Sequence, residues 1–131
     1  MSNPRINFSG NSPWEPLVGY SRAVRVGNLI WVAGTTATND LGELVGPGDP
    51  YAQTMQVLTN IQQALFRAGA TLENVVRTRI FVTNINNWEI IGRAHGQFFS
   101  IIRPVATMVE VARLIDPQML VEIEVDAILP I

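Results

Sequence analysis

The sequence has no cysteine and only one histidine, His95, and both shortages exclude classes of function. Without cysteine the chain can form no disulfide, no thiolate nucleophile and no cysteine-ligated metal site. A zinc or copper site around His95 would have to be built mostly from carboxylates, which is unusual for those metals. We therefore expect no bound metal and no cofactor.

Charge is scarce as well, and no long apolar run occurs. Charged residues make up 15% of the 131 residues, and the formal net charge is -2. Lysine and arginine form no cluster, so electrostatic binding to nucleic acid is disfavoured. No apolar run is long enough to cross a bilayer, and the N-terminal sequence lacks the basic start and apolar stretch of a signal peptide. These absences predict a cytoplasmic protein that binds neither nucleic acid nor a membrane.

Apolar residues, by contrast, make up 47% of the chain, which is enough for a sizeable core. A chain of this length is too short for two cores that each offset the entropy of folding, so a single domain over residues 1–131 is expected. Little charge is left for the surface. The protein is therefore expected to hide apolar surface against neighbouring subunits.

Alternation of side chains predicts five strands. They cover residues 21–26, 29–34, 75–82, 105–112 and 120–128. Gly27-Asn28 joins the first two, because glycine tolerates the positive φ that a two-residue hairpin turn needs. One face of the strand 75–82 is expected to carry Val76, Thr78, Ile80 and Val82, and the other Arg77, Arg79 and Phe81.

Two helices are predicted between these strands. Asp49 can cap the first with its side chain, and Pro50 needs no N–H in the first turn, whereas Gly69 should stop the helix after about Ala68. Its buried stripe is expected to consist of Met55, Leu58, Ile61, Leu65 and Ala68. The second helix begins near Trp88 after a cap at Asn86 or Asn87, and one of its faces should carry Trp88, Ile91, His95, Phe98 and Ile102. The fold class is therefore α+β, with both helices on one face of the sheet.

The last strand places three carboxylates, Glu122, Glu124 and Asp126, on one face. They are either a general acid/base cluster or a solvated strand face that pairs with arginines of the strand 75–82. His95 lies on the apolar side of its helix, where a lone histidine is more often packed or hydrogen-bonded than catalytic. The three tryptophans are interpreted as packing or interface residues, and no nucleophile-elbow, phosphate-loop or dinucleotide motif occurs.

Several short motifs resemble those of one family, in its order and spacing. They are Tyr20-Ser21, Gly27-Asn28-Leu29-Ile30 with Gly34, Gly69-x-Thr71-x-x-x-Val75-Val76, Phe81-Val82, Phe98-Phe99, and the block from Val109 to Leu114 with Val121 to Glu124. The chain resembles the RidA/YjgF family of enamine and imine deaminases over residues 17–128. This resemblance implies a chorismate-mutase-like (bacillus type) fold, with a mixed sheet and two helices on one face. It also implies a homotrimer in which the sheets form a barrel and the pockets lie between subunits.

The resemblance further implies which residues form the site. In active members an arginine binds the substrate carboxylate, a glutamate activates water and a tyrosine lines the pocket. The tyrosine and glutamate correspond to Tyr20 and Glu122, whereas the arginine position holds Ala106. The expected substrate-binding positions are Ala33, Gly34, Gly92, Ala106, Thr107 and Met108. Loss of the guanidinium removes about 1.5 to 3 kcal/mol of binding, so simple imino acids should bind poorly, and the substrate anion is either held elsewhere or absent.

Two functions stay open for this small-molecule site. The first is a deaminase-like hydrolase that releases ammonia from an unusual enamine or imine, which the retained Tyr20 and Glu122 favour. The second is a non-catalytic ligand-binding or interaction module on the same trimer, which the small residues Ala33, Gly92 and Ala106 favour. Ribonuclease activity, sometimes ascribed to the family, is disfavoured because the sequence has no basic groove or histidine pair.

Overall fold

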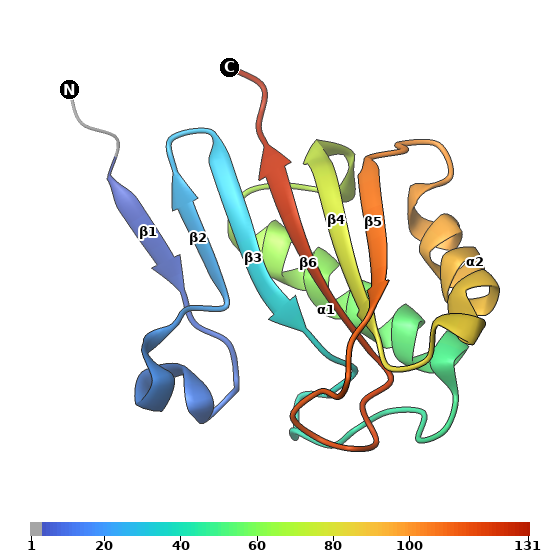
Figure 1. The fold of residues 1–131 in the computed structure, drawn as a ribbon. Coiled ribbons are helices and arrows are strands. Elements are labelled where there is room, and N and C mark those ends of the chain that lie inside the picture. The colour runs from blue at the N-terminus through green and yellow to red at the C-terminus, as the bar shows by residue number, and fades with distance from the viewer. Residues whose placement is uncertain (1–3) are drawn as a thin grey trace.

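A six-stranded mixed sheet with two helices is the framework of the molecule, seen in a computed structural model that describes residues 4–131 (Figure 1). The first three residues of the predicted domain 1–131 lie outside this range. The strands are β1 (Arg5–Phe8), β2 (Ala23–Val26), β3 (Leu29–Thr35), β4 (Val75–Val82), β5 (Val105–Glu110) and β6 (Val121–Ile128). The helices are α1 (Pro50–Arg67) and α2 (Trp88–Phe99), with short helical turns η1 (Glu15–Gly19), η2 (Leu72–Asn74) and η3 (Ile85–Asn87).

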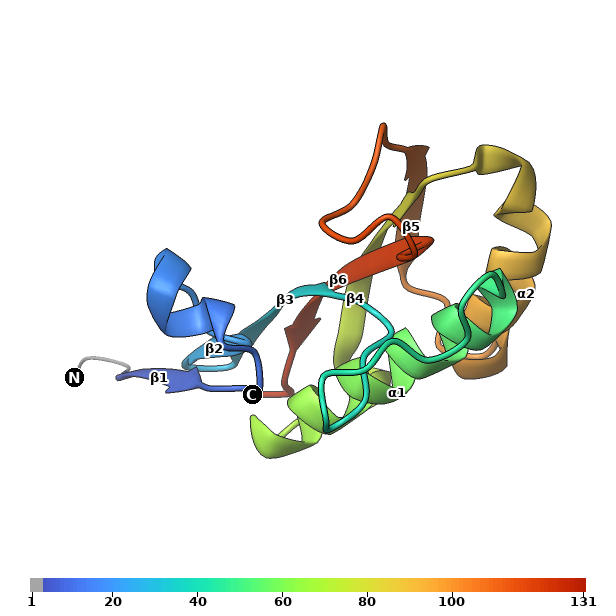
Figure 2. The same ribbon diagram turned by 90° about the horizontal axis from the view of Figure 1, so that it is seen from below.

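The strand order is β1-β2-β3-β6-β4-β5, so the last strand of the chain lies in the middle of the sheet. Only β4 and β5 run parallel among the paired strands of the described chain. Figure 2 shows α1 and α2 on the same face of the sheet, as the sequence predicts. The opposite face is left open, and no helix in residues 4–131 is long and apolar enough to cross a membrane.

Local signals placed the hairpin and the first helix correctly. Gly27 adopts a φ of 59° in the turn between β2 and β3. The Asp49 side chain accepts a hydrogen bond of 3.0 Å from the Ala52 backbone N–H, which caps α1. Gly69 follows α1 with a φ of 93°, a conformation that side-chain-bearing residues rarely adopt.

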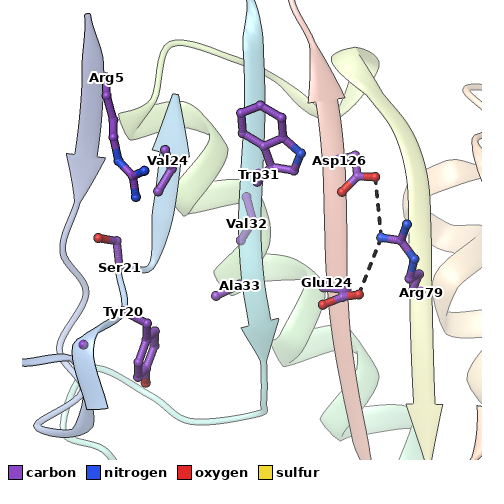
Figure 3. A pocket seen from close by; sticks show the side chains of 11 residues that line it. Arg5, Tyr20, Ser21, Val24, Trp31, Val32, Ala33, Arg79, Glu124 and Asp126 are labelled. Carbon is purple, nitrogen blue, oxygen red and sulfur yellow. Dashed lines mark hydrogen bonds and ion pairs between the residues drawn. The ribbon is translucent and has the colours of Figure 1, made fainter. Parts of the chain in front are cut away.

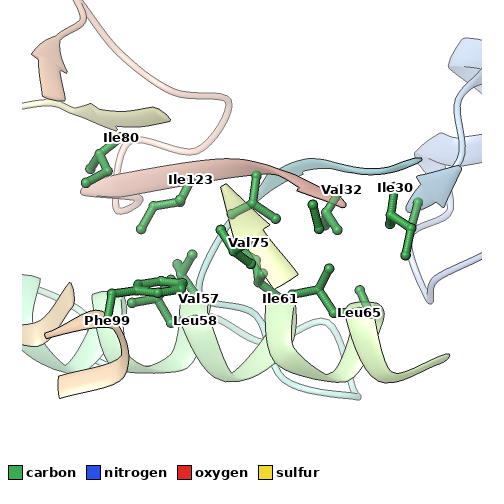
Figure 4. Packing of buried hydrophobic residues seen from close by; sticks show 14 of the residues in the cluster. Ile30, Val32, Val57, Leu58, Ile61, Leu65, Val75, Ile80, Phe99 and Ile123 are labelled. Atoms are coloured by element: carbon green, nitrogen blue, oxygen red, sulfur yellow. The ribbon is translucent and has the colours of Figure 1, made fainter. Parts of the chain in front are cut away.

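The core lies between α1, α2 and the covered face of the sheet. It includes Ile30, Val32 and Ile123 from the strands and Leu58, Ile61, Leu65 and Phe99 from the helices (Figure 4). Val125 of β6 belongs to the same cluster. The prediction that Met55 belongs to the buried stripe of α1 is wrong, because Thr54 occupies that place on the helix face. The Thr54 hydroxyl donates to the Pro50 carbonyl at 2.7 Å, so its burial leaves no unpaired polar group.

Two other predicted faces and one predicted strand end need correction. Val76 is 42% exposed because the register of β4 against β6 shifts between Val75 and Arg77, which turns Val75 to the core instead. On α2, Trp88 is exposed, and Phe99 rather than Phe98 is the fully buried aromatic residue. β5 also ends at Glu110, two residues before the predicted end.

β1 is a strand that the sequence analysis did not predict. Its four residues pair with β2, but three of them are exposed and the fourth is half-buried. Arg5, Ile6, Asn7 and Phe8 do alternate between polar and apolar side chains, so a strand signal four residues long was present and the sequence analysis did not use it.

Candidate functional site

Two of the three β6 carboxylates form ion pairs on the open face of the sheet. Arg79 Nη1 lies 3.5 Å from Glu124 Oε1 and 3.5 Å from Asp126 Oδ2 (Figure 3). Arg77 Nε lies 3.6 Å from the same Asp126 oxygen. All four side chains are partly exposed, so these pairs stabilise the fold only weakly. The salt-bridged interpretation therefore holds for Glu124 and Asp126, and Glu122 stands apart from it.

Glu122 lies beside a β-bulge in β3. Val32 pairs with Val125 and Thr35 with Ile123, so Ala33 and Gly34 together oppose one residue of β6. The Glu122 carboxylate packs directly on the Gly34 backbone: a Cβ built on Gly34 would lie only 2.6 Å from Glu122 Oε2. The absence of a side chain at position 34 is therefore what leaves room for this carboxylate.

The surroundings of Glu122 shift its protonation toward neutral pH. Burial raises the pKa of the Glu122 carboxyl above its ordinary value, the charge of Arg22 lowers it, and the charge of Glu124 raises it. Burial is the largest effect, so the net pKa is raised. A carboxylate with a raised pKa is a stronger base than an ordinary glutamate, which suits proton transfer near neutral pH.

A wide groove of about 1020 Å³ contains Glu122, Gly34 and Tyr20. Its other walls come from residues 9–15, the chain after β3, one side of α1 and the turn before β6. The Tyr20 hydroxyl donates to Ser12 Oγ at 3.3 Å. Thus the two predicted catalytic residues, together with Gly34, line one groove within a single chain.

Arg22 belongs to the same groove, and the sequence analysis did not identify it. Its Nη2 donates to the Gly34 carbonyl at 2.7 Å, and its Cζ lies 5.9 Å from the centre of the Tyr20 ring. A signal for this placement was present in the sequence. In extended chain, residues two apart point to the same side, so an arginine two residues after Tyr20 is expected to lie beside it.

The remaining predicted site residues lie elsewhere. Ala33 lines a smaller hollow on the open face of the sheet, which it shares with Tyr20, Trp31 and Glu124 (Figure 3). Gly92 is on α2, and Ala106, Thr107 and Met108 are on β5, the edge strand separated from β3 by β6 and β4 (Figure 1). Within one chain the predicted site therefore falls into two groups, one beside β3 and one at the opposite edge of the sheet.

His95 is a packed residue, as the sequence predicts. Its Nε2 forms a hydrogen bond of 3.0 Å with Thr78 Oγ1, and its ring lies 4.7 Å from that of Phe99. Burial lowers the pKa of the imidazole. Across residues 4–131, no group of three or more histidine and carboxylate side chains is arranged to hold a metal ion.

Comparison with known proteins supports this arrangement of helices and strands. The family model described as endoribonuclease L-PSP matches residues 9–129. The crystal structure of a Mycobacterium tuberculosis protein, described as a member of the highly conserved YjgF/YER057c/UK114 family, is 52% identical with a TM-score of 0.87. That match covers 96% of this chain and 100% of the other. The chain belongs to the RidA/YjgF family.

Other members of the RidA/YjgF family carry different descriptions. An uncharacterized protein of Streptomyces coelicolor is 41% identical over 117 residues, which is 88% of this chain and 86% of that protein. The 3-aminoacrylate deaminase RutC of Acinetobacter baylyi is 32% identical over 108 residues, or 82% of this chain and 85% of that protein. The family thus includes a deaminase, and the present fold is the family's chorismate-mutase-like fold.

Proposed function

We propose that this RidA/YjgF protein is a deaminase-like hydrolase that releases ammonia from an enamine or imine, with Glu122 as the general base. The observation that carries the proposal is the position of Glu122. Its half-buried carboxylate has a raised pKa, rests on Gly34 at the wall of a groove, and shares that groove with Tyr20. Unlike Glu124 and Asp126, it has no ion-pair partner within 4.0 Å in the described part of the chain.

The proposed reaction needs one base that later acts as an acid. An enamine first tautomerises to the imine. Solvent protonates the imine nitrogen. The Glu122 carboxylate then takes a proton from water while the water oxygen bonds to the iminium carbon, and the C=N electron pair moves to nitrogen, which gives a neutral carbinolamine. The Glu122 carboxyl transfers this proton to the amine nitrogen. The C–N bond breaks as the hydroxyl proton passes back to the Glu122 carboxylate, so that ammonia and a carbonyl compound are released, and Glu122 returns the last proton to solvent. The same group serves both steps because its raised pKa lies closer to neutral pH.

The proposal includes a homotrimer in which a neighbouring subunit completes the pocket. The two groups of predicted site residues are separated within one chain, and β5 carries exposed side chains at nearly every position. Docking of this edge of one subunit beside the groove of the next would bring Gly92, Ala106, Thr107 and Met108 to Glu122. Sedimentation equilibrium should then give three times the chain mass. The cytoplasmic location expected from the sequence stays a prediction.

The activity is tested with a panel of enamines and imines that includes 2-aminoacrylate and 3-aminoacrylate, by following ammonia release. Glu122→Gln should lower the rate at least about 100-fold, because general acid–base catalysis contributes about 10² to 10⁴. Asp126→Asn is the matched control, since Asp126 lies on the same strand face but pairs with Arg77 and Arg79. A Glu122→Gln protein that keeps its full rate would show that Glu122 is not the base.

The non-catalytic alternative rests on the small side chains at the second group of positions. A Cβ on Gly92 would meet no atom within 4 Å, and Ala106 is exposed, so both leave open space. If no member of the panel is turned over, and a compound bound to the trimer is recovered unchanged, the protein is a binding module.

A further inference from the structure

We propose that Arg22 binds the carboxylate of the substrate, in place of the arginine that Ala106 does not supply. This inference rests on the proposed function and adds to it the residue that binds the carboxylate of a 2-imino or 2-enamino acid. It also changes the expectation drawn from Ala106 alone, that simple imino acids should bind poorly. The anion is then held within the same chain as Glu122.

Arg22 is held in a fixed position at the wall of the groove. Nη2 donates to the Gly34 carbonyl at 2.7 Å, and the guanidinium lies over the Tyr20 ring. A Cβ on Gly10 would lie 3.2 Å from Arg22 Cδ, so the Gly10 backbone packs against the stem of the side chain. A guanidinium fixed by these contacts loses little conformational freedom when it binds an anion.

The guanidinium has donors to spare. It carries five N–H groups, of which one is used on Gly34. In the described range, Arg22 Nε is the one buried side-chain nitrogen or oxygen that has no hydrogen-bond partner. Arg22 Nη1 also has no hydrogen bond, but it does not belong to the buried atoms, so it is accessible. Nη1 and the second N–H of Nη2 are therefore free to bind the two oxygens of a carboxylate end-on.

The carboxylates near Arg22 do not neutralise it. Glu15 is buried, but both of its oxygens accept from the Gly10 backbone N–H, at 2.9 and 3.0 Å. No ion pair within 4.0 Å joins Arg22 to Glu15, to Glu122, or to Asp40 and Asp116, which also line the groove. Among residues 4–131, no carboxylate is thus ion-paired with the positive Arg22 in this groove.

The spacing between Arg22 and Glu122 fits a short substrate. Both contact Gly34, Arg22 through the carbonyl oxygen and Glu122 through the side where a Cβ would stand. They are close enough for the Arg22 charge to act on Glu122, yet too far apart to pair. In a 2-imino acid the carboxylate carbon is bonded directly to the imine carbon. A carboxylate on Arg22 therefore places the reacting carbon toward Glu122 and its water.

The test compares pyruvate, the 2-oxo acid formed from 2-aminoacrylate, with its uncharged amide, pyruvamide, in protein-observed NMR titrations of the intact protein. The wild type should bind pyruvate more tightly. Arg22→Gln should weaken pyruvate binding about tenfold to a hundredfold and weaken pyruvamide binding far less, because the uncharged amide does not form the charge-assisted pair. Arg22→Lys, which keeps one charge but cannot form a bidentate pair, should lie between them. Arg67→Gln is the control, since it removes another arginine from the groove wall.

The outcomes separate the binding of the carboxylate by Arg22, called the clamp below, from the proposed reaction. If Arg22→Gln and Arg22→Lys weaken the binding of pyruvate and of pyruvamide equally, Arg22 only supports the groove. If Arg67→Gln weakens pyruvate binding as much as Arg22→Gln does, any nearby positive charge suffices. Either result overturns the clamp, even where turnover depends on Glu122. Loss of the pyruvate preference in Arg22→Gln, in a protein that turns over no imine, would uphold the clamp and reject the reaction.

Discussion

Gly34→Ala is the sharpest test of the site, because the change is one methyl group and its contact is known. The backbone at Gly34 has no positive φ, so alanine is not strained there. The added Cβ would lie 2.6 Å from Glu122 Oε2, 3.0 Å from Cδ and 3.3 Å from Cγ. Ordinary contacts begin at 3.4 Å, so the carboxylate must move by about 0.8 Å. A misplacement of about 1 Å can lower a catalytic rate about 100-fold, whereas the free energy of unfolding should change by less than about 1 kcal/mol because a flexible side-chain end can move.

The assay measures imine hydrolysis and, independently of activity, the pKa of Glu122 by carboxyl ¹³C NMR. We expect a rate loss of about tenfold to a hundredfold and a lower pKa, because the displaced carboxylate gains water. Gly96→Ala is the matched control: it lies on α2, its Cβ would meet nothing within 4 Å, and it should stabilise the helix by about 0.5 to 1 kcal/mol at unchanged rate. The reasoning fails if Gly34→Ala leaves the rate intact, or lowers it equally in a Glu122→Gln background.

Two further predictions concern pH and the core. Burial lowers the pKa of His95 below its ordinary 6.5, so the unfolded chain binds the proton more tightly. The free energy of unfolding should therefore fall as the pH drops below 6.5. NMR titration of this lone histidine should give a midpoint below 6.5, and a midpoint above 6.5 would contradict the prediction. Gln53 is fully buried and binds the carbonyls of Gly46 and Gln118 and the N–H of Leu120. Gln53→Leu should therefore destabilise the protein by about 2 to 4 kcal/mol in urea unfolding, and a change below about 0.5 kcal/mol would show that water replaces these bonds.

The sequence predicted those elements whose signals are local. Asp49, Pro50 and Gly69 mark both ends of α1 within a few residues of the chain, and alternation alone placed the β6 carboxylates opposite the core. Val76 was assigned to the wrong face because its orientation depends on a register shift against β6, a strand more than 40 positions later. A pattern within one strand carries no information about such a shift.

In the candidate site, too, the sequence identified single residues but not the contacts that depend on the pairing of distant strands. Tyr20, Gly34 and Glu122 were identified by resemblance, but the packing of Glu122 on Gly34 arises from the pairing of β3 with β6, which no motif states. Arg22 was missed because a single arginine before a strand reads as an ordinary surface charge. Its contact with the Gly34 carbonyl exists only once the hairpin is folded.

The bulge at Ala33 and Gly34 has a consequence for how the chain can vary in length. Val32 and Thr35 both face the helices although they are three positions apart, because one extra residue separates them. Deleting that residue would restore plain alternation along β3 and leave every core side chain in phase with β6. The packing of the core would change little, whereas Glu122 and Arg22 would no longer contact the same glycine. The extra residue in this strand therefore shapes the groove and is not needed for the alternation that builds the core.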